Sequence, residues 1–252
     1  MLPLAHIYVS TEVAGRKSPL LVFGSVLPDV SWTSKSEIGR DETHYAPREL
    51  YEYIITNCPE FTDLALGVRL HSNVGKGADY YSDGEGSSGF AYIEGKNIEA
   101  NVADLLGEEK NRNTATLSHS FIEAATDALL NEDKPEILDL YDNAIKDINL
   151  VDISECLSEY LKLDSAIVLS EIKNFLNFVG PEAYSSKDKM IDGLLLLIKQ
   201  GRGKAVDRNE SANTLSTAID LMRGKYQSYL NNAIINMRRD FGDLVASPSA
   251  SR

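Results

Sequence analysis

The chain has 252 residues, of which 43% are hydrophobic and 25% are charged, and its 38 acidic and 25 basic side chains give a formal net charge of −13 at pH 7. This composition is typical of a globular protein of one large or two small domains that buries a sizeable core without disulfide or metal support. The acidic surplus repels phosphate backbones and anionic lipid, so it excludes duplex nucleic acid as a partner unless a bound cation reverses the local field.

Targeting signals and cysteine spacing bear on the location of the chain. No basic stretch followed by an apolar run of signal-peptide length occurs near the N-terminus, and the strongest apolar run, 194–198, is far shorter than the roughly 20 residues of a membrane helix. We therefore expect a cytoplasmic protein with no integral membrane association. Cys58 and Cys156 lie outside any Cys-x-x-Cys spacing, which predicts isolated buried thiols rather than a zinc ribbon or a disulfide framework.

Short helices separated by polar turns are predicted for the N-terminal half. Proline disfavours helix in the residue before it, so the second apolar segment ends at Pro28 and leaves Asp29 at an element end or in a loop. Residues 31–46 are polar and are expected to be irregular. Residues 72–89 are glycine-rich and acidic but lack the Lys-Ser/Thr ending of a P-loop, which predicts a flexible loop or lid. The predicted helices cover 4–15, 20–27, 47–58, 59–71, 96–107 and 112–131.

Beyond residue 135 the apolar spacing is helical almost without interruption. The last predicted helix carries apolar side chains at spacings of three and four from Leu215 to Phe241, a stripe that packs on the core or on a partner helix. A homo-oligomer formed through this long C-terminal helix is therefore a further expectation. The predicted helices cover 135–148, 152–161, 165–179, 186–200 and 210–241.

No alternating strand pattern of useful length occurs, so we predict an all-α fold. Its expected organisation is a metal-binding helical core over residues 1–133 and a helical region over 134–252 that packs on it, with one continuous domain as the alternative. Residues 247–252 are expected to form a disordered tail.

The histidines are the most informative polar residues, because residues 120–252 contain none of the four. His119 and Glu123 lie four residues apart in a strong helical pattern, so they share a face and can hold one cation together. His71 ends an apolar helical stretch, and Asp79 follows close enough for a loop to fold it back. Taken singly, each of these residues also fits an ordinary structural role, such as a surface hydrogen-bonded pair or a buried core histidine.

Taken in chain order, the chain resembles the zinc-dependent phospholipase C family, which is related to the single-strand-specific zinc nucleases. Four short runs and a loop histidine carry the resemblance over residues 5–127: Ala5-His-Ile7, Phe23-Gly-Ser-Val-Leu-Pro-Asp29, Leu66-Gly-Val-Arg-Leu-His71 and Ser118-His-Ser-Phe-Ile-Glu123. The resemblance implies a multi-helical phospholipase C/nuclease-like bundle. The metal ligands that it implies are His6, Asp29, His44, His71, His119 and Glu123.

Two positions depart from the family pattern. Gly75 stands four residues after His71, where the family has an aspartate that bridges two metals, and Asp79 is the nearest candidate where the family has a further histidine. We therefore expect one or two zinc ions rather than three, with Asp79 as the substitute ligand and other divalent metals as alternatives.

The resemblance implies a metal-dependent hydrolase that cleaves a phosphoester or phosphodiester with metal-activated water. Asp29, at an element end among the ligands, is the expected catalytic carboxylate, because it can bind metal and orient the attacking water. The expected substrate is a small phosphodiester or a phospholipid headgroup. Because the chain is acidic, we expect its phosphate to be bound through metal and not through lysine or arginine.

Two alternatives remain open at this point. The His-Asp metal phosphohydrolases are also all-helical, but they require an adjacent His-Asp pair, and no histidine here precedes an aspartate. The other alternative is a catalytically decayed helical interaction protein that retains the fold, which the missing aspartate at Gly75 supports.

Overall fold

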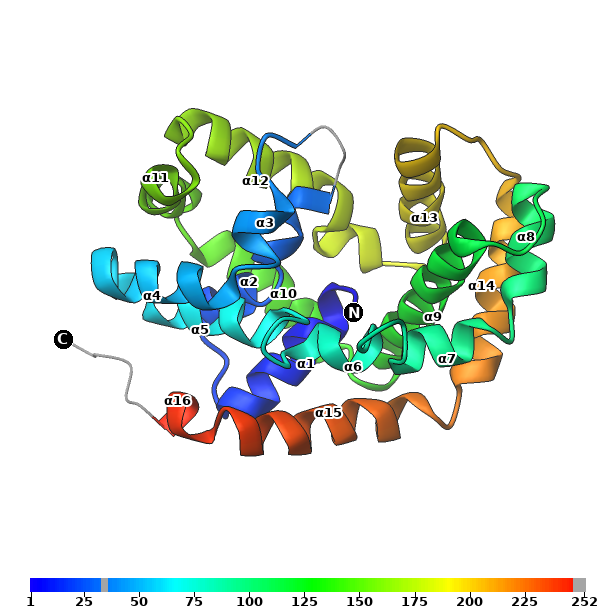
Figure 1. Ribbon diagram of the computed structural model, residues 1–252, viewed down its shortest axis with the longest axis horizontal. Coiled ribbons are helices and arrows are strands. Elements are labelled where there is room, and N and C mark those ends of the chain that lie inside the picture. Colours follow the sequence, from blue (N-terminus) through cyan, green and yellow to red (C-terminus); the bar gives the residue numbers. More distant parts are fainter. Residues whose placement is uncertain (33–35, 247–252) are drawn as a thin grey trace.

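The computed structural model describes residues 1–32 and 36–246, and every regular element in these ranges is a helix (Figure 1). The predicted all-α fold is therefore confirmed. In the N-terminal half the elements are α1 (Pro3–Ala14), α2 (Pro19–Gly24), η1 (Leu27–Trp32), α3 (Arg40–Thr43), α4 (Pro47–Asn57), η2 (Pro59–Phe61), α5 (Thr62–His71), α6 (Ala78–Ser82), α7 (Phe90–Gly95), α8 (Glu99–Leu106) and α9 (Arg112–Asp133). In the C-terminal half they are α10 (Glu136–Asp147), α11 (Leu150–Leu161), α12 (Ser165–Val179), η3 (Pro181–Tyr184), α13 (Lys187–Arg202), α14 (Arg208–Met222), α15 (Tyr226–Asp240) and α16 (Gly242–Ala246).

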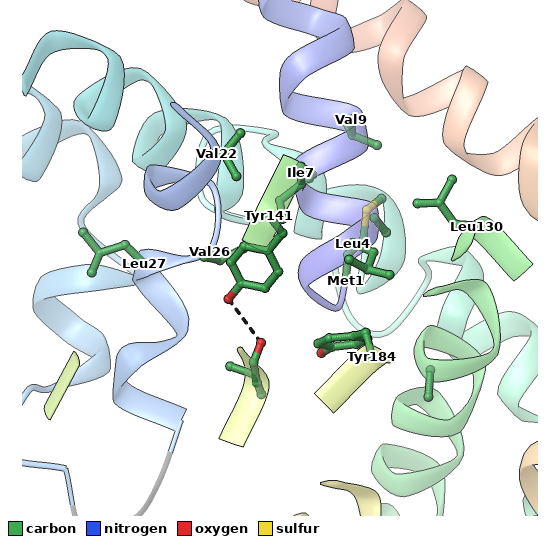
Figure 2. Packing of buried hydrophobic residues seen from close by; sticks show 14 of the residues in the cluster. Met1, Leu4, Ile7, Val9, Val22, Val26, Leu27, Leu130, Tyr141 and Tyr184 are labelled. Carbon is green, nitrogen blue, oxygen red and sulfur yellow. Dashed lines mark hydrogen bonds between the residues drawn. The ribbon is translucent and has the colours of Figure 1, made fainter. Parts of the chain in front are cut away.

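The buried apolar side chains form one cluster that contains residues from both halves of the chain. Tyr141 on α10 is fully buried in it, and its hydroxyl donates a hydrogen bond to the carbonyl oxygen of Val179 at 3.1 Å (Figure 2). Figure 2 shows this ring among apolar side chains of α1 and of the segment after α2. Helix α1, which carries His6, is therefore held by packing on helices that lie far from it in the sequence.

Helices α2 and α5 approach each other backbone to backbone, because each has a glycine at the contact. A Cβ atom on Gly24 would lie 2.2 Å from the carbonyl oxygen of Leu64, and one on Gly67 would lie 2.5 Å from that of Leu21. Only glycine allows helices to come so close. This contact brings Asp29 beside His71 at the end of α5. Asp29 lies within η1, so its predicted place at an element end or in a loop is wrong.

Several short helices lie where the sequence predicts none, among them α3, α6 and α7. Helix α3 forms within the segment 31–46, α6 forms within the segment 72–89, and α7 precedes the predicted helix 96–107, of which α8 occupies 99–106. Phe90 of α7 is buried and packs in the core. Such short helices are stabilised by tertiary packing rather than by sequence periodicity, so the periodic pattern does not reveal them.

The predicted long C-terminal helix is wrong, because the segment 210–241 forms the two helices α14 and α15. Gly224 lies between them with φ of 85°, a left-handed conformation that only glycine adopts readily. The two halves of the apolar stripe then pack separately: α14 lies against α9, and α15 runs along one edge of the molecule against α1 (Figure 1). Since Leu215 and Met237 are both buried within the chain, the stripe packs as core.

The prediction of isolated thiols is also wrong, because Cys58 and Cys156 form a disulfide. Their Cα atoms lie 6.2 Å apart across a sequence separation of 98 residues, and the bond ties the end of α4 to α11. Sequence separation gives no information on such a contact, since it arises only when the two helices pack. Disulfides are typical of oxidising compartments and rare in the cytosol, so this bond weighs against the expected cytoplasmic location.

None of the helices in residues 1–32 and 36–246 has both the length and the hydropathy needed to cross a lipid bilayer. The predicted disordered tail, 247–252, lies outside the described residues.

Candidate metal centre

The seven side chains predicted as metal ligands converge on one polar cleft of about 200 Å³. Asp29, His44, Asp79, His119 and Glu123 line the cleft, and the other two, both histidines, are buried behind it. Three sets of residues each bring three ligand atoms together, and within a set these atoms all lie within 4.8 Å of one another. The sets are His6, Asp29 and His71; His44, His71 and Asp79; and Asp83, His119 and Glu123. We call the first two sets, which share a histidine, the histidine-rich group, and the third the α9 group.

Asp79 is the centre of the histidine-rich group. Its Oδ1 lies 3.0 Å from Nε2 of His6, and its Oδ2 lies 2.8 Å from Nε2 of His44 and 3.3 Å from Nε2 of His71. Asp29 Oδ1 faces two of the same rings, at 3.5 Å from Nε2 of His71 and 3.8 Å from Nε2 of His44. Three imidazoles from α1, α5 and the end of α3 thus point their Nε2 atoms at two carboxylates.

A hydrogen bond to a backbone carbonyl group orients the ring of His71 so that its Nε2 faces the cluster. Its Nδ1–H donates to the carbonyl oxygen of Ser25 at 2.8 Å, so Nε2 is left for a cation. Burial lowers the pKa of this ring, but the negative charges of Asp79 and Asp29 outweigh burial and raise the pKa of His71 to about 10. Burial and the neighbouring charge of His71 lower the pKa of His6 to about 4, so His6 is neutral and able to bind metal at pH 7.

Several buried ligand atoms have no hydrogen-bond partner within the part of the chain that the structure describes. They include Nε2 of His6, Nε2 of His71 and Oε1 of Glu123. Each lies near an opposite charge, but the contacts lack hydrogen-bond geometry. An unsatisfied buried polar atom costs about 1–3 kcal/mol. A divalent cation satisfies such nitrogens and oxygens together, so these residues fit a metal.

The α9 group forms the second candidate position. His119 and Glu123 share one face of α9, as their spacing predicts, with His119 Nε2 lying 3.1 Å from Oε1 of Glu123 and 2.7 Å from Oδ1 of Asp83. Burial lowers the pKa of His119, but the charge of Glu123 and the hydrogen bond to Asp83 raise it to about 9. The Tyr92 ring covers the imidazole at a centroid distance of 4.4 Å.

The chain's first amino group connects the two groups. The ammonium of Met1 lies 2.5 Å from Oδ1 of Asp79 and 2.8 Å from Oε1 of Glu123. Burial alone would raise the pKa of both carboxyls. For Asp79, the ammonium and His71 outweigh burial and hold the pKa well below its usual range. For Glu123, His119 and the ammonium lower the pKa to about 2.

Asp83 is a candidate ligand that sequence reasoning missed. It directly follows α6, four residues after Asp79, and in a helical turn residues four apart lie on the same side. That spacing was the available signal, but it is informative only if the glycine-rich segment is helical. Through this single turn, Asp79 reaches the histidine-rich group and Asp83 reaches the α9 group.

Asp127 continues the column of His119 and Glu123 on α9, but it contacts backbone rather than the cluster. Its carboxylate accepts hydrogen bonds at 2.9 Å from the backbone N–H groups of Leu4 and Ala5, in the first turn of α1. The residue before α1, Leu2, provides no side-chain cap, so Asp127 caps this helix from α9. Burial raises the pKa of Asp127 to about 7, while the two backbone hydrogen bonds oppose that rise.

Gly75 belongs to the turn after α5 and does not face the cluster. Its φ is 90°, and a Cβ atom there would lie 2.5 Å from the guanidinium of Arg69. An aspartate at this position would therefore have a strained backbone. Asp79 lies among the histidines instead, in contact with Nε2 of His6, His44 and His71.

No protein-family model, no curated protein and no solved structure matches this chain. The chemistry of the cleft must therefore be inferred from its own residues.

Proposed function

We propose that the protein is a metal-dependent hydrolase that cleaves a phosphoester, with zinc as its metal. The observation that carries the proposal is the set of buried imidazole nitrogens that lack hydrogen bonds and point at carboxylates beside an open cleft. Imidazole and carboxylate together are a ligand set typical of zinc sites. Manganese and iron accept similar donors and remain alternatives.

Each group would hold one ion. His44, His71 and Asp79 are the best set in the histidine-rich group, since their ligand atoms lie within 4.8 Å of one another and His44 borders the cleft. Asp83, His119 and Glu123 form the second set, also within 4.8 Å. This arrangement agrees with the expectation of one or two ions. The two ligand sets support the phospholipase C-like interpretation only in the types of the ligand residues and in their order along the chain.

The reaction we propose is attack of a water oxygen on phosphorus, with the ester oxygen leaving and taking up a proton. Bound divalent ions lower the pKa of water and polarise phosphoryl oxygens. Asp29 lines the cleft with its side chain 16% exposed, so its carboxylate can accept a hydrogen bond from the attacking water and orient it. His71 and His44 in turn hold this carboxylate in place.

Metal analysis of the purified chain tests the proposal. After zinc loading and removal of free metal, we expect up to two zinc ions per chain, with loss of metal in Asp79→Asn and in His119→Ala. Asp142→Asn is a matched control, because Asp142 lies on the exposed face of α10 and pairs with Lys146. Phosphoester hydrolysis should require the metal and stop with a chelator.

A chain that stays near zero metal after loading with zinc, manganese or iron refutes the proposal. That result would favour the alternative of a helical interaction protein that retains the fold without activity.

A further inference from the structure

Arg40 is the only arginine or lysine among the described residues that line the metal cleft. Apart from the phenol of Tyr92, the other ionisable groups that line the cleft are the Met1 ammonium and the carboxylates and imidazoles of the two ligand groups. A guanidinium carries a positive charge and offers only donors, so Arg40 adds a cationic group to the wall of the cleft.

Local structure fixes Arg40 beside the histidine-rich group. In the single turn of α3 the N–H of His44 donates to the carbonyl oxygen of Arg40 at 2.8 Å, so the two side chains lie on one side of the turn. The Thr43 hydroxyl donates to the carbonyl oxygen of Pro28 at 3.0 Å, which ties α3 to the turn that carries Asp29. The guanidinium also lies over the Tyr45 ring, 5.6 Å from its centroid.

No carboxylate in residues 1–32 and 36–246 forms an ion pair with Arg40. The carboxylates of the cleft face imidazoles and the Met1 ammonium instead. Arg48, eight residues later, pairs with Glu52 at 2.8 Å. Two divalent ions would balance the four carboxylates of the ligand groups in charge, and the Met1 ammonium beside Asp79 and Glu123 adds a further positive charge. A further cation next to such ions is repelled unless an anion lies between them.

We propose that Arg40 binds a phosphoryl oxygen of the substrate, and that the substrate is a phosphate monoester. The inference rests on the proposed function and names its substrate class. A guanidinium offers two parallel N–H donors that match two phosphoryl oxygens. A monoester has three unesterified oxygens and nearly two negative charges at pH 7, whereas a diester has two such oxygens and one charge.

The monoester therefore gains more from a guanidinium beside two metal sites than a diester does. Arg40 also revises the expectation that phosphate is bound through metal alone. The chain as a whole carries a net charge of −13 and repels phosphates, so local cations must provide the attraction.

The test compares the zinc-loaded wild type with Arg40→Ala, Arg40→Lys and the control Arg48→Ala, after equal zinc content has been established. Binding of inorganic phosphate is measured by titration calorimetry, and hydrolysis is measured with p-nitrophenyl phosphate and bis(p-nitrophenyl) phosphate. We expect Arg40→Ala to weaken phosphate binding about tenfold or more, since a charged, two-point contact is lost. Arg40→Lys should lose less, and Arg48→Ala should match the wild type.

In hydrolysis, the wild type should prefer the monoester, and Arg40→Ala should lower that preference mainly through a higher KM. If zinc binds but phosphate binds equally well to Arg40→Ala, the Arg40 proposal is overturned while the metal centre stands. Preference of the wild type for the diester also overturns it. If zinc does not bind to the wild type, the proposed function itself fails, and the Arg40 proposal fails with it.

Discussion

Replacing Cys58 and Cys156 together by serine removes the covalent link between α4 and α11. In the chain-entropy account, a disulfide stabilises a protein by restricting its unfolded chain, and more so for a longer loop. The sequence separation is 98 residues, and a loop of about 100 residues corresponds to about 4.7 kcal/mol at 25 °C. Measured losses are commonly about 2–4 kcal/mol, so we expect the free energy of unfolding to fall within that range or slightly above it.

The assay is guanidinium unfolding of the metal-free protein, with the free energy of unfolding obtained by linear extrapolation. A loss of this size would lower Tm by roughly 4–16 °C, at about 2–4 °C per kcal/mol for a chain of this length. The matched control is a reductant: it should destabilise the wild type to the level of Cys58→Ser/Cys156→Ser and leave that double variant unchanged. Zinc content should stay the same, because neither cysteine lines the cleft.

A loss below about 1 kcal/mol, or a wild type that is insensitive to reductant, would refute this reasoning. The first result would mean that the cross-link restricts the unfolded chain little. The second would mean that the two sulfur atoms are not joined in solution.

Four further measurements test how the cleft is held. Raising the pH from 6.5 to 10 should lower Tm of the metal-free protein. The pKa values of His71, about 10, and His119, about 9, are raised in the folded protein, which therefore binds these two protons more tightly than the unfolded chain and loses stability as they dissociate. The zinc-loaded protein should show the opposite trend and lose stability below about pH 6, where protons displace the metal. Asp127→Ala should cost about 0.5–2 kcal/mol in unfolding by chemical denaturation, because the first turn of α1 loses its cap. Gly24→Ala should lower the free energy of unfolding by about 1–3 kcal/mol and weaken zinc binding, because the added Cβ meets the backbone of α5. At Gly193 a Cβ meets nothing within 4 Å, so Gly193→Ala should raise the free energy of unfolding by about 0.5–1 kcal/mol in the same assay.

Each of these expectations has a clear contrary outcome. A metal-free Tm that rises with pH would show that the two histidines are not stabilised by their carboxylates. An unchanged stability of Asp127→Ala would mean that water caps α1 equally well. Equal effects at Gly24 and Gly193 would contradict the close approach of α2 and α5.

The sequence by itself determined the helical class and the pairing of His119 with Glu123. Both depend on spacings of three and four residues within one segment, and such spacings translate directly into a shared helix face. The start of α4 at Pro47 follows from local backbone restrictions in the same way. The predicted end of a segment at Pro28 is wrong, because α2 ends at Gly24 and Pro28 lies within η1. The resemblance in the order of the ligands along the chain then suggested which residues converge, but it gave no role to Asp83 or Arg40.

Only the tertiary structure decided the rest. The break at Gly224, the disulfide and the turn of α6 each depend on contacts between segments far apart in the chain. The two glycines between α2 and α5 allow Asp29 to meet His71, and α6 places Asp79 and Asp83 against different helices. Periodicity is a property of one segment, whereas convergence depends on which surfaces pack together, so the cleft and the unpaired cation on its wall become visible only in the folded chain.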